Sequence, residues 1–563
     1  MLNLQKALEE DITAGLAAAG ISLPDGMGRI VVERPQKEGA GHYATPVALA
    51  LAKHVGKSPM DIVEAIATNM PKKEYIGKLE AAAPGFLNIW ISNEWLVSRI
   101  DNVLEEDIYE DSAIGQGQHV NLEFISANPT GPLTLGNART AFSADTLANI
   151  LECAGFNVTR EYYVNDAGNQ IRRLGESVLR RALELQGEKI EFPDGLYEGE
   201  YIYDIAKQVL EQWKENEGKE FTVEDLDDAK LLEKISREAM EYCLAEIKSI
   251  VHDDLKIHMD VWTSEEAVRK SGKIEEVLDA LRKDGHTYIK DGTEFLKTTQ
   301  WGDEEDRVLV KKDGEYAYIA PDIAYHQDKF DRKFDVIFTF LGADHQGHVP
   351  KLMGAMKALG NDTSKLRFIV AQFLSIMRDG APVKLSKRAG RVFGPQDLIE
   401  EIGYDAARFF LIQHSLESHM TLDLAIAKER SERNPVFYIQ YAHVRLQSIL
   451  RKAKEAGLIE QIDEAVAVPE HLPLNESSEL ALLRAMYGLP EVITEVSKTF
   501  DTHDLAYYAQ SLAKAVHQFY REVPVLASQD KDLVASRLLL VQAASKVLGQ
   551  TLDLLGISKP DVM

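Results

Sequence analysis

Cysteine is scarce in this chain of 563 residues. Only Cys153 and Cys243 occur, far apart and without a Cys-x-x-Cys spacing. A disulfide framework or a structural zinc site would need more cysteines at closer spacing. We therefore expect two reduced thiols in the core and no bound metal.

Long apolar runs are absent as well. No uninterrupted apolar stretch reaches the ~18 residues that a membrane span needs. The first ten residues predict an amphipathic helix rather than a secretory signal, because Leu2, Leu4 and Leu8 are apolar among charged neighbours. These absences predict a cytoplasmic protein without a membrane segment.

Positive charge is in short supply. The sequence has 63 Lys and Arg residues but 90 Asp and Glu residues, so its net charge is −27. Phosphate binding draws its affinity from Lys and Arg, so this balance by itself argues against a nucleic-acid partner. The net charge is only an average, however, because an acidic protein of this size can still present a local basic surface.

The length leaves room for three or four domains. The start of the chain alternates helical and strand-like patterns, which predicts a small α/β domain. From about residue 430 onward the pattern is helical and predicts a bundle. The expected division is 1–115, 116–395, a connecting segment 396–433, and 434–563.

The domain 116–395 has the pattern of a Rossmann-type doubly wound parallel sheet. A strand, a turn-rich loop, a helix and a second strand follow one another over residues 119–164, which predicts a βαβ unit. Residues 185–300 are charged and mostly helical in pattern, and we interpret them as an insertion between the two halves of the sheet. The second half is predicted from strand patterns at 316–319, 335–341 and 367–374.

Two loops of this domain carry residue types suited to a nucleotide. The first leads from a strand into a helix N-terminus, whose free N–H groups and positive dipole attract an anion. Within it, Gly136 lets a nucleotide lie close to the backbone, and Thr134 and Asn137 offer neutral hydrogen-bond donors. Taken alone, such a loop is equally typical of a structural turn.

The second loop follows the last predicted strand and is cationic. Its residues Lys384, Lys387 and Arg388 can neutralise charge that develops on a leaving pyrophosphate. Taken alone, the segment is more typical of a solvated basic turn. On the two halves of one sheet, however, the two loops frame a single crevice at the switch point of the strand order.

The order of these motifs resembles the class I aminoacyl-tRNA synthetases and, within that class, the arginyl-tRNA synthetase family. The class carries a His-x-Gly-His loop and a Lys-Met-Ser-Lys-Ser loop, which correspond here to the first and second loops. The first signature segment comprises Ala127, Asn128, Pro129, Thr130, Gly131, Pro132, Leu133, Thr134, Leu135, Gly136 and Asn137. Further segments of the family recur in order at 41–45, 162–170, 341–345, 434–443 and 554–556.

This resemblance implies ATP-dependent ligation of L-arginine to tRNA(Arg) through arginyl-adenylate, with Mg²⁺ carried on ATP and no tightly bound cofactor. The implied ATP site comprises Thr134, Gly136, Asn137, Lys384, Ser386 and Lys387, of which Thr134, Asn137, Lys384 and Lys387 would act in catalysis. The implied arginine site comprises Glu123, Ser126, Asn128, Tyr318, Asp322 and Asp344.

The resemblance also implies contacts with tRNA. The N-terminal domain would bind the tRNA elbow through Phe86 and Asn88, and the segment 396–433 would contact the stem. The helical domain would bind the anticodon through Tyr441, His443 and Arg445. The implied protein is a monomer.

The chemistry of the implied arginine site is coherent. A guanidinium is planar and permanently charged, so a carboxylate such as Asp322 can select it through paired hydrogen bonds. A buried polar site rejects an analogue that lacks the donors far more strongly than an apolar pocket rejects a missing methylene. We therefore expect no editing domain.

The sequence departs from the family pattern at the first signature, where Thr134 and Asn137 replace two histidines. Both side chains still donate hydrogen bonds, but the loss of one transition-state donor costs on the order of a hundred-fold in rate. The alternative is therefore a catalytically inactive paralogue that binds tRNA. A different class I enzyme, such as the cysteine-specific synthetase, is disfavoured because the chain has too few cysteines for that enzyme's metal site.

Overall fold

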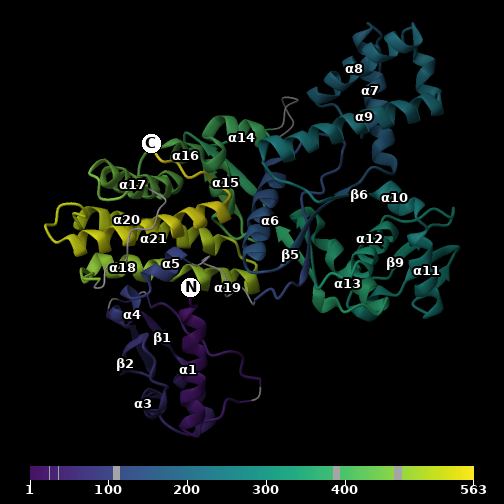
Figure 1. The fold of residues 1–563 in the computed structure, drawn as a ribbon. Coiled ribbons are helices and arrows are strands. Elements are labelled where there is room, and N and C mark those ends of the chain that lie inside the picture. Colours follow the sequence, from purple (N-terminus) through teal and green to yellow (C-terminus); the bar gives the residue numbers. More distant parts are fainter. Residues whose placement is uncertain (25, 36, 38, 106–113, 384–392, 462–471) are drawn as a thin grey trace. The chain divides into compact units, whose positions relative to one another are not determined.

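The computed structural model describes the whole chain except residues 25, 36, 38, 106–113, 384–392 and 462–471 (Figure 1). The described residues form two compact units. The first comprises Met1–Ile114, Arg430–Phe500 and Asp504–Met563, and the second comprises Gly115–Glu429 and Asp501–His503. The first unit therefore combines both ends of the chain, whereas the second is nearly continuous in sequence.

A five-stranded parallel sheet forms the centre of the second unit, in the order β11-β10-β4-β5-β6. The chain begins in the middle of the sheet at β4, continues outward to β5 and β6, and returns to the other side of β4 with β10 and β11. This is the doubly wound topology that the sequence predicts. The strands are β4 His119–Glu123, β5 Asn157–Val164, β6 Val261–Ser264, β10 Val336–Gly342 and β11 Leu366–Ala371.

Helices account for most of the remainder of this unit (Figure 1). Ile323, Ile337 and Met356 are fully buried in a core that joins α12, β10 and α13. The helices are α6 Leu135–Cys153, α7 Asn169–Leu185, α8 Glu200–Glu217, α9 Ala229–Ser249, α10 Glu265–Lys270, α11 Lys273–Lys283, α12 Ile319–Asp331, α13 Val349–Ala358, α14 Pro395–Ile402, α15 Tyr404–Ile412 and α16 Leu424–Lys428.

Two small sheets complete the second unit. One is antiparallel, and the other joins β12 to β13 antiparallel and to β14 in parallel. The strands are β7 Thr287–Lys290, β8 Thr293–Leu296, β9 Arg307–Val310, β12 Leu374–Arg378, β13 Ala381–Pro382 and β14 Met420–Asp423.

Two predictions about this unit were wrong in part. Residues 185–300 are not simply a helical insertion, because they also contain β6, an edge strand of the main sheet, and the hairpin β7–β8. The strand predicted at 316–319 is absent: Tyr316 makes only an isolated bridge to Val310, and α12 begins at Ile319. Segments of four residues are too short for their periodicity to separate strand from helix.

The first unit contains a three-stranded antiparallel sheet and a set of helices from both ends of the chain. This agrees with the predicted N-terminal α/β fold and C-terminal helical fold. The strands are β1 Tyr43–Thr45, β2 Ile76–Ala82 and β3 Phe86–Ile91. The helices are α1 Leu4–Ala18, α2 Val47–Val55, α3 Pro59–Asn69, α4 Asn93–Val97, α5 Ile100–Glu105, α17 Pro435–Glu455, α18 Ser477–Met486, α19 Leu489–Thr499, α20 His503–Glu522 and α21 Lys531–Leu555.

Helix α21 is the one helix among the described residues that is long and apolar enough to cross a membrane, and 83% of its most apolar window is buried inside the protein. It begins at an Asp530 cap and ends where Gly556 adopts a left-handed φ of 68°. These features are typical of the central helix of a bundle. Of the two cysteines, Cys243 is buried and Cys153 is half-buried, and neither forms a disulfide.

Candidate functional site

The switch point of the sheet lies between β4 and β10, and the loop that leaves β4 carries the first signature segment. The chain turns at the start of this loop, where two residues have positive φ, Ile125 at 67° and Ser126 at 38°. Non-glycine residues rarely adopt this conformation, and such strain is concentrated at functional sites. The backbone therefore turns sharply at the place where a ligand of a doubly wound sheet is expected.

Hydrogen bonds from three elements fix this loop. The Ser126 hydroxyl accepts from the backbone N–H of Tyr163 at 3.1 Å and donates to Glu123 Oε1 at 3.0 Å. The hydroxyl of Tyr162 donates to the carbonyl of Ala127 at 2.9 Å, and that of Tyr201 to the carbonyl of Thr130 at 2.7 Å. The side chain of Ser126 is thus engaged in shaping the loop, whereas Asn128 is exposed.

The loop ends at the N-terminus of α6, where Thr134 and Asn137 form a capping box. Asn137 Oδ1 accepts from the Thr134 backbone N–H at 2.9 Å and from its hydroxyl at 2.7 Å. The backbone N–H of Asn137 donates in return to Thr134 Oγ1 at 3.3 Å. A side chain added at Gly136 would approach only Thr134 Oγ1, at 3.5 Å, so the space above this turn is open.

A buried cation neutralises Glu123 at the end of β4. Lys329 on α12 is fully buried, and its Nζ lies 2.6 Å from Glu123 Oε2. Thr339 on β10 donates to the same oxygen at 3.2 Å. The Glu123 carboxylate is therefore held from β10, from α12 and from Ser126 in its own loop, and it is a rigid part of the sheet edge.

Asp322, on the first turns of α12, lies within electrostatic range of two other carboxylates. Its pKa is raised to about 8, first by burial and then by the negative charges of Glu265 and Glu123. Glu265 is itself buried, and its pKa is raised by burial although Arg269 Nη2 lies 2.6 Å from it. A cation placed between Asp322 and Glu265 would relieve this repulsion.

Aromatic rings border these carboxylates. Tyr163 at the end of β5 stacks on Tyr325 of α12, with centroids 4.3 Å apart. Tyr318, at the start of α12, is 77% exposed. The sequence predicts Tyr318 and Asp322 in this region, but it does not identify Glu265. Glu265 begins a six-residue helix after a four-residue strand, and only the strand pairing brings it to the sheet edge.

Asp344 and His345 follow β10 in the short 3₁₀ helix Ala343–His348, and both are exposed. The other predicted loop, with Lys384, Ser386 and Lys387, lies outside the described residues. Among the residues that the structure does describe, no three His, Cys, Asp or Glu side chains are grouped so that they could hold a metal ion.

The residues predicted to contact tRNA lie in the first unit. Phe86 is half-buried on β3, but Asn88 is only 7% exposed, so a direct contact is better supported for Phe86. On α17, Tyr441 is 36% exposed, stacks on Phe437, and lies 4.5 Å from the Arg445 guanidinium.

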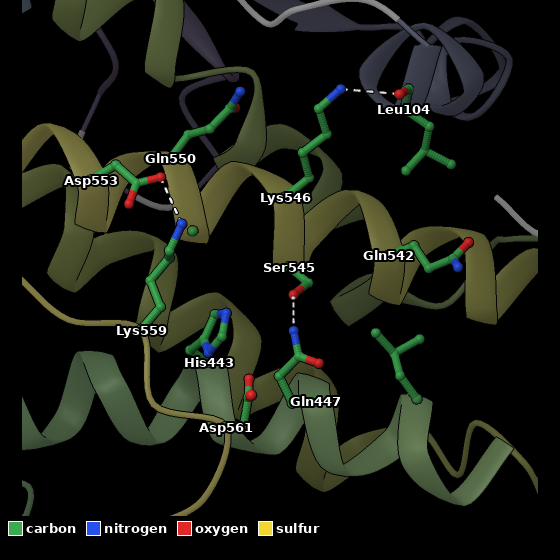
Figure 2. Close-up of a pocket in the computed structure, with 12 residues that line it drawn as sticks. Leu104, His443, Gln447, Gln542, Ser545, Lys546, Gln550, Asp553, Lys559 and Asp561 are labelled. Carbon is green, nitrogen blue, oxygen red and sulfur yellow. Dashed lines mark hydrogen bonds and ion pairs between the residues drawn. The ribbon is translucent and has the colours of Figure 1, made fainter. Parts of the chain in front are cut away.

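His443 does not share that surface. It is buried, and its Nδ1 lies 3.1 Å from the carbonyl of Pro560. Figure 2 shows it facing a pocket between α17, α21 and the end of the chain, beside Gln447 and its partner Ser545. Residues at i and i+4 of a helix share a face, so Tyr441 and Arg445 lie on one side of α17 and His443, at i+2, lies on another.

Three families match successive parts of the sequence. They are the arginyl tRNA synthetase N terminal domain over residues 6–91, the class I (R) tRNA synthetase catalytic domain over 99–434, and the DALR anticodon binding domain over 439–563. The catalytic-domain match alone spans more than half of the chain.

Whole-length relatives agree. The arginine–tRNA ligase of Bacillus subtilis is 38% identical over 562 residues, which cover 100% of this chain and 99% of the relative. The arginine–tRNA ligase of Geobacillus kaustophilus is 37% identical with the same coverage. The arginyl-tRNA synthetase of Thermus thermophilus has the same fold, with a TM-score of 0.77 at 22% identity and complete coverage of both chains. The chain therefore belongs to the arginyl-tRNA synthetase family.

Proposed function

We propose that the carboxyl edge of the parallel sheet binds L-arginine and ATP, forms arginyl-adenylate, and passes the arginyl group to tRNA(Arg). The observation that carries the proposal is the electrostatic interaction between two carboxylates, the half-buried Asp322 and the buried Glu265. Without a cation between them, their repulsion helps to raise the pKa of Asp322 to about 8. The site is thus built for a positively charged ligand.

A guanidinium suits this pair better than an ammonium does. It offers five N–H donors in a planar array, so two carboxylates can accept paired hydrogen bonds from different edges. A lysine side chain carries its charge on a single compact group and would leave some of these acceptors unsatisfied. Sites of this kind discriminate by roughly 10⁴ or more, which supports selection of arginine without a separate editing site.

The remainder of the arginine molecule would lie along the loop after β4. Asn128, Tyr318 and Asp344 are exposed and therefore accessible to a ligand. Ser126 and Glu123 are already hydrogen-bonded, so we propose that they shape the site and supply negative potential for the α-amino group.

ATP would occupy the N-terminus of α6. Gly136 leaves the space above this turn open, and the helix dipole favours a phosphate there. The Nδ2 hydrogens of Asn137 take no part in the capping box, since the cap uses Oδ1 and the backbone N–H. They supply the neutral donor that replaces a histidine of the family signature.

The reaction would be an in-line attack of the arginine carboxylate on the α-phosphorus of ATP, with pyrophosphate as the leaving group. The terminal ribose hydroxyl of tRNA then attacks the adenylate and releases AMP. The chain contributes position and charge, and no covalent enzyme intermediate is required. By family resemblance, Ser386 would belong to the ATP site, and Lys384 and Lys387 would neutralise the departing pyrophosphate, with Mg²⁺ carried on ATP.

The other parts of the chain would bind tRNA. We propose that residues 1–115 contact the tRNA elbow through Phe86, that 396–433 contact the stem, and that 434–563 bind the anticodon. Tyr441 and Arg445 combine an exposed ring with a cation, as suits unpaired bases. We further propose a monomer that acts in the cytoplasm.

Arginine-dependent ATP–pyrophosphate exchange, with tRNA present, tests the amino-acid site. Asp322→Asn should lower kcat/KM for arginine by at least a hundred-fold, because it removes the acceptor charge. Asp328→Asn is the matched control, since Asp328 lies on the same helix, is half-buried and is paired with Arg332. Equal activity of Asp322→Asn and wild type, or activation of lysine or cysteine in place of arginine, would overturn the proposal.

A further inference from the structure

The segment that follows β5 has no part in the function proposed above, although it is one of the segments that resemble the family. It runs Asn-Asp-Ala-Gly-Asn-Gln over residues 165–170. Its aspartate, Asp166, is the second residue beyond the end of the strand. The side chain accepts two hydrogen bonds, both from the neighbouring strand–helix junction between β6 and α10.

The two bonds of Asp166 flank a single residue. Ser264 Oγ donates to Asp166 Oδ2 at 2.6 Å, and the backbone N–H of Glu266 donates to Asp166 Oδ1 at 2.8 Å. The residue between them is Glu265, the first residue of α10. Asp166 therefore holds the Ser264 side chain before Glu265 and the Glu266 backbone after it.

Helix α10 needs this support. It has six residues, Glu265–Lys270, and helices far longer than this are marginal when isolated. Ser264 caps the helix by accepting from the Ala267 backbone N–H at 3.0 Å, and Asp166 satisfies the next free N–H group at the same end. From within the helix, Arg269 Nε lies 2.8 Å from Glu265 Oε1. The carboxylate of Glu265 is thus held by Arg269 from within the helix, while Asp166 and Ser264 hold the start of the helix that carries it.

We propose that Asp166 is a positioning residue for arginine recognition, acting through Ser264 and Glu266 to hold the Glu265 carboxylate at the guanidinium end of the site. This inference rests on the proposed function of the Asp322–Glu265 pair. Asp166 itself touches no substrate. Displacement of a binding group by about 1 Å can cost on the order of a hundred-fold, so loss of Asp166 should weaken arginine binding specifically.

The test compares two aspartates with the same local chemistry. Asp228 caps α9 by accepting from the backbone N–H groups of Lys230 and Leu231 at 2.9 and 3.1 Å, and it has no link to Glu265. Asp166→Ala should raise KM for arginine about ten- to a hundred-fold in pyrophosphate exchange, with KM for ATP within about twofold of wild type. Asp228→Ala should change neither constant. Asp166→Asn, which keeps an acceptor for the Glu266 N–H, should recover most of the lost affinity.

A double-mutant cycle tests whether the effect passes through Glu265. If it does, Asp166→Ala combined with Glu265→Gln should raise KM for arginine no more than Glu265→Gln alone. The inference would be overturned if the KM increases of the two single variants multiplied in the double variant, or if Asp166→Ala had the wild-type KM for arginine. If Glu265→Gln itself leaves KM unchanged, the proposed arginine site fails instead. Should Asp166→Ala not fold, Ser264→Ala removes one of the two bonds together with the Ser264 cap of α10, and it must raise KM for arginine for the inference to stand.

Discussion

Thr134 Oγ1 and Asn137 Oδ1 lie 2.7 Å apart at the first turn of α6. These two residues stand where the family signature has histidines, and in this chain they cap the helix by bonding to each other. The cap leaves the two Nδ2 hydrogens of Asn137 available, while the Thr134 hydroxyl is already committed as a donor. Asn137 is therefore the better candidate for a contact with ATP.

The substitution Asn137→Asp distinguishes the role of Asn137 as a helix cap from its proposed contact with ATP. An aspartate keeps the oxygen that the cap uses, and its negative charge suits a helix N-terminus. It removes the Nδ2 donors, however, and repels phosphate. We predict that Asn137→Asp lowers kcat for pyrophosphate exchange about a hundred-fold without loss of thermal stability. Thr134→Ser, which preserves every bond of the cap, should stay near wild type. Full activity of Asn137→Asp would mean that Asn137 acts only as a cap.

The raised pKa of Asp322 predicts a pH dependence of arginine binding. In the free enzyme the group is neutral below pH about 8 and binds a guanidinium weakly. The kcat/KM for arginine should therefore rise about tenfold per pH unit up to this value and then level off. At saturating arginine, kcat should be nearly flat, because the bound cation lowers the pKa of the carboxyl group. Initial rates between pH 6 and 9 test this; a flat kcat/KM profile would contradict it.

The same group affects the free energy of unfolding with a defined sign. The folded chain keeps the Asp322 proton up to pH about 8, whereas the unfolded chain releases it near pH 4. Between these values the folded state binds more protons, so stability falls as pH rises through this window. Asp322→Asn should make the unfolding temperature less sensitive to pH between 5 and 8. An unchanged pH dependence in the variant would show that Asp322 does not hold its proton in the folded state.

The ion pair between Lys329 and Glu123 should matter for stability. Lys329→Met leaves the buried Glu123 carboxylate without its cation, which we expect to cost about 3 kcal/mol. Lys329→Met combined with Glu123→Gln should recover part of this loss, because neither charge then remains buried. Differential scanning calorimetry of wild type and the two variants measures the difference. A single variant as stable as wild type would show that the pair contributes nothing.

Tyr441 should contribute to tRNA affinity and not to amino-acid affinity. Its ring is 36% exposed beside Arg445, and stacking of a base on an aromatic ring contributes ~1–3 kcal/mol. Tyr441→Ala should raise KM for tRNA about ten- to a hundred-fold and leave KM for arginine unchanged. Tyr507, 48% exposed on α20, gives the matched control. An equal loss in both variants would show that the effect is not specific to the face around Tyr441.

Much of the fold could be predicted because its elements are long and regular. The helix α6 and the strand β5 lie within the βαβ unit that the pattern over residues 119–164 predicts. The short strand β6 could not be predicted, since four residues give no clear period. The strand predicted at 316–319 was wrong for the same reason, because four residues give no clear period.

The candidate site residues also differ in whether the sequence could predict them. Asp322 and Glu123 could be found from motifs within their own segments. Glu265 and Lys329 could not, because each reaches the sheet edge through the packing of elements far apart in sequence. The sequence does not show that His443 is buried whereas Tyr441 is exposed, because this difference depends on which face of the helix packs against the bundle.

Charging of cognate tRNA transcript with radiolabelled arginine and ATP tests the central claim most directly. Wild type should transfer arginine to tRNA, while Asp322→Asn and Lys387→Ala should fail at the same enzyme concentration and Asp328→Asn should succeed. Specific binding of the transcript by wild type without any charging would contradict the account, and would identify the chain as a tRNA-binding protein that retains the fold but not the reaction.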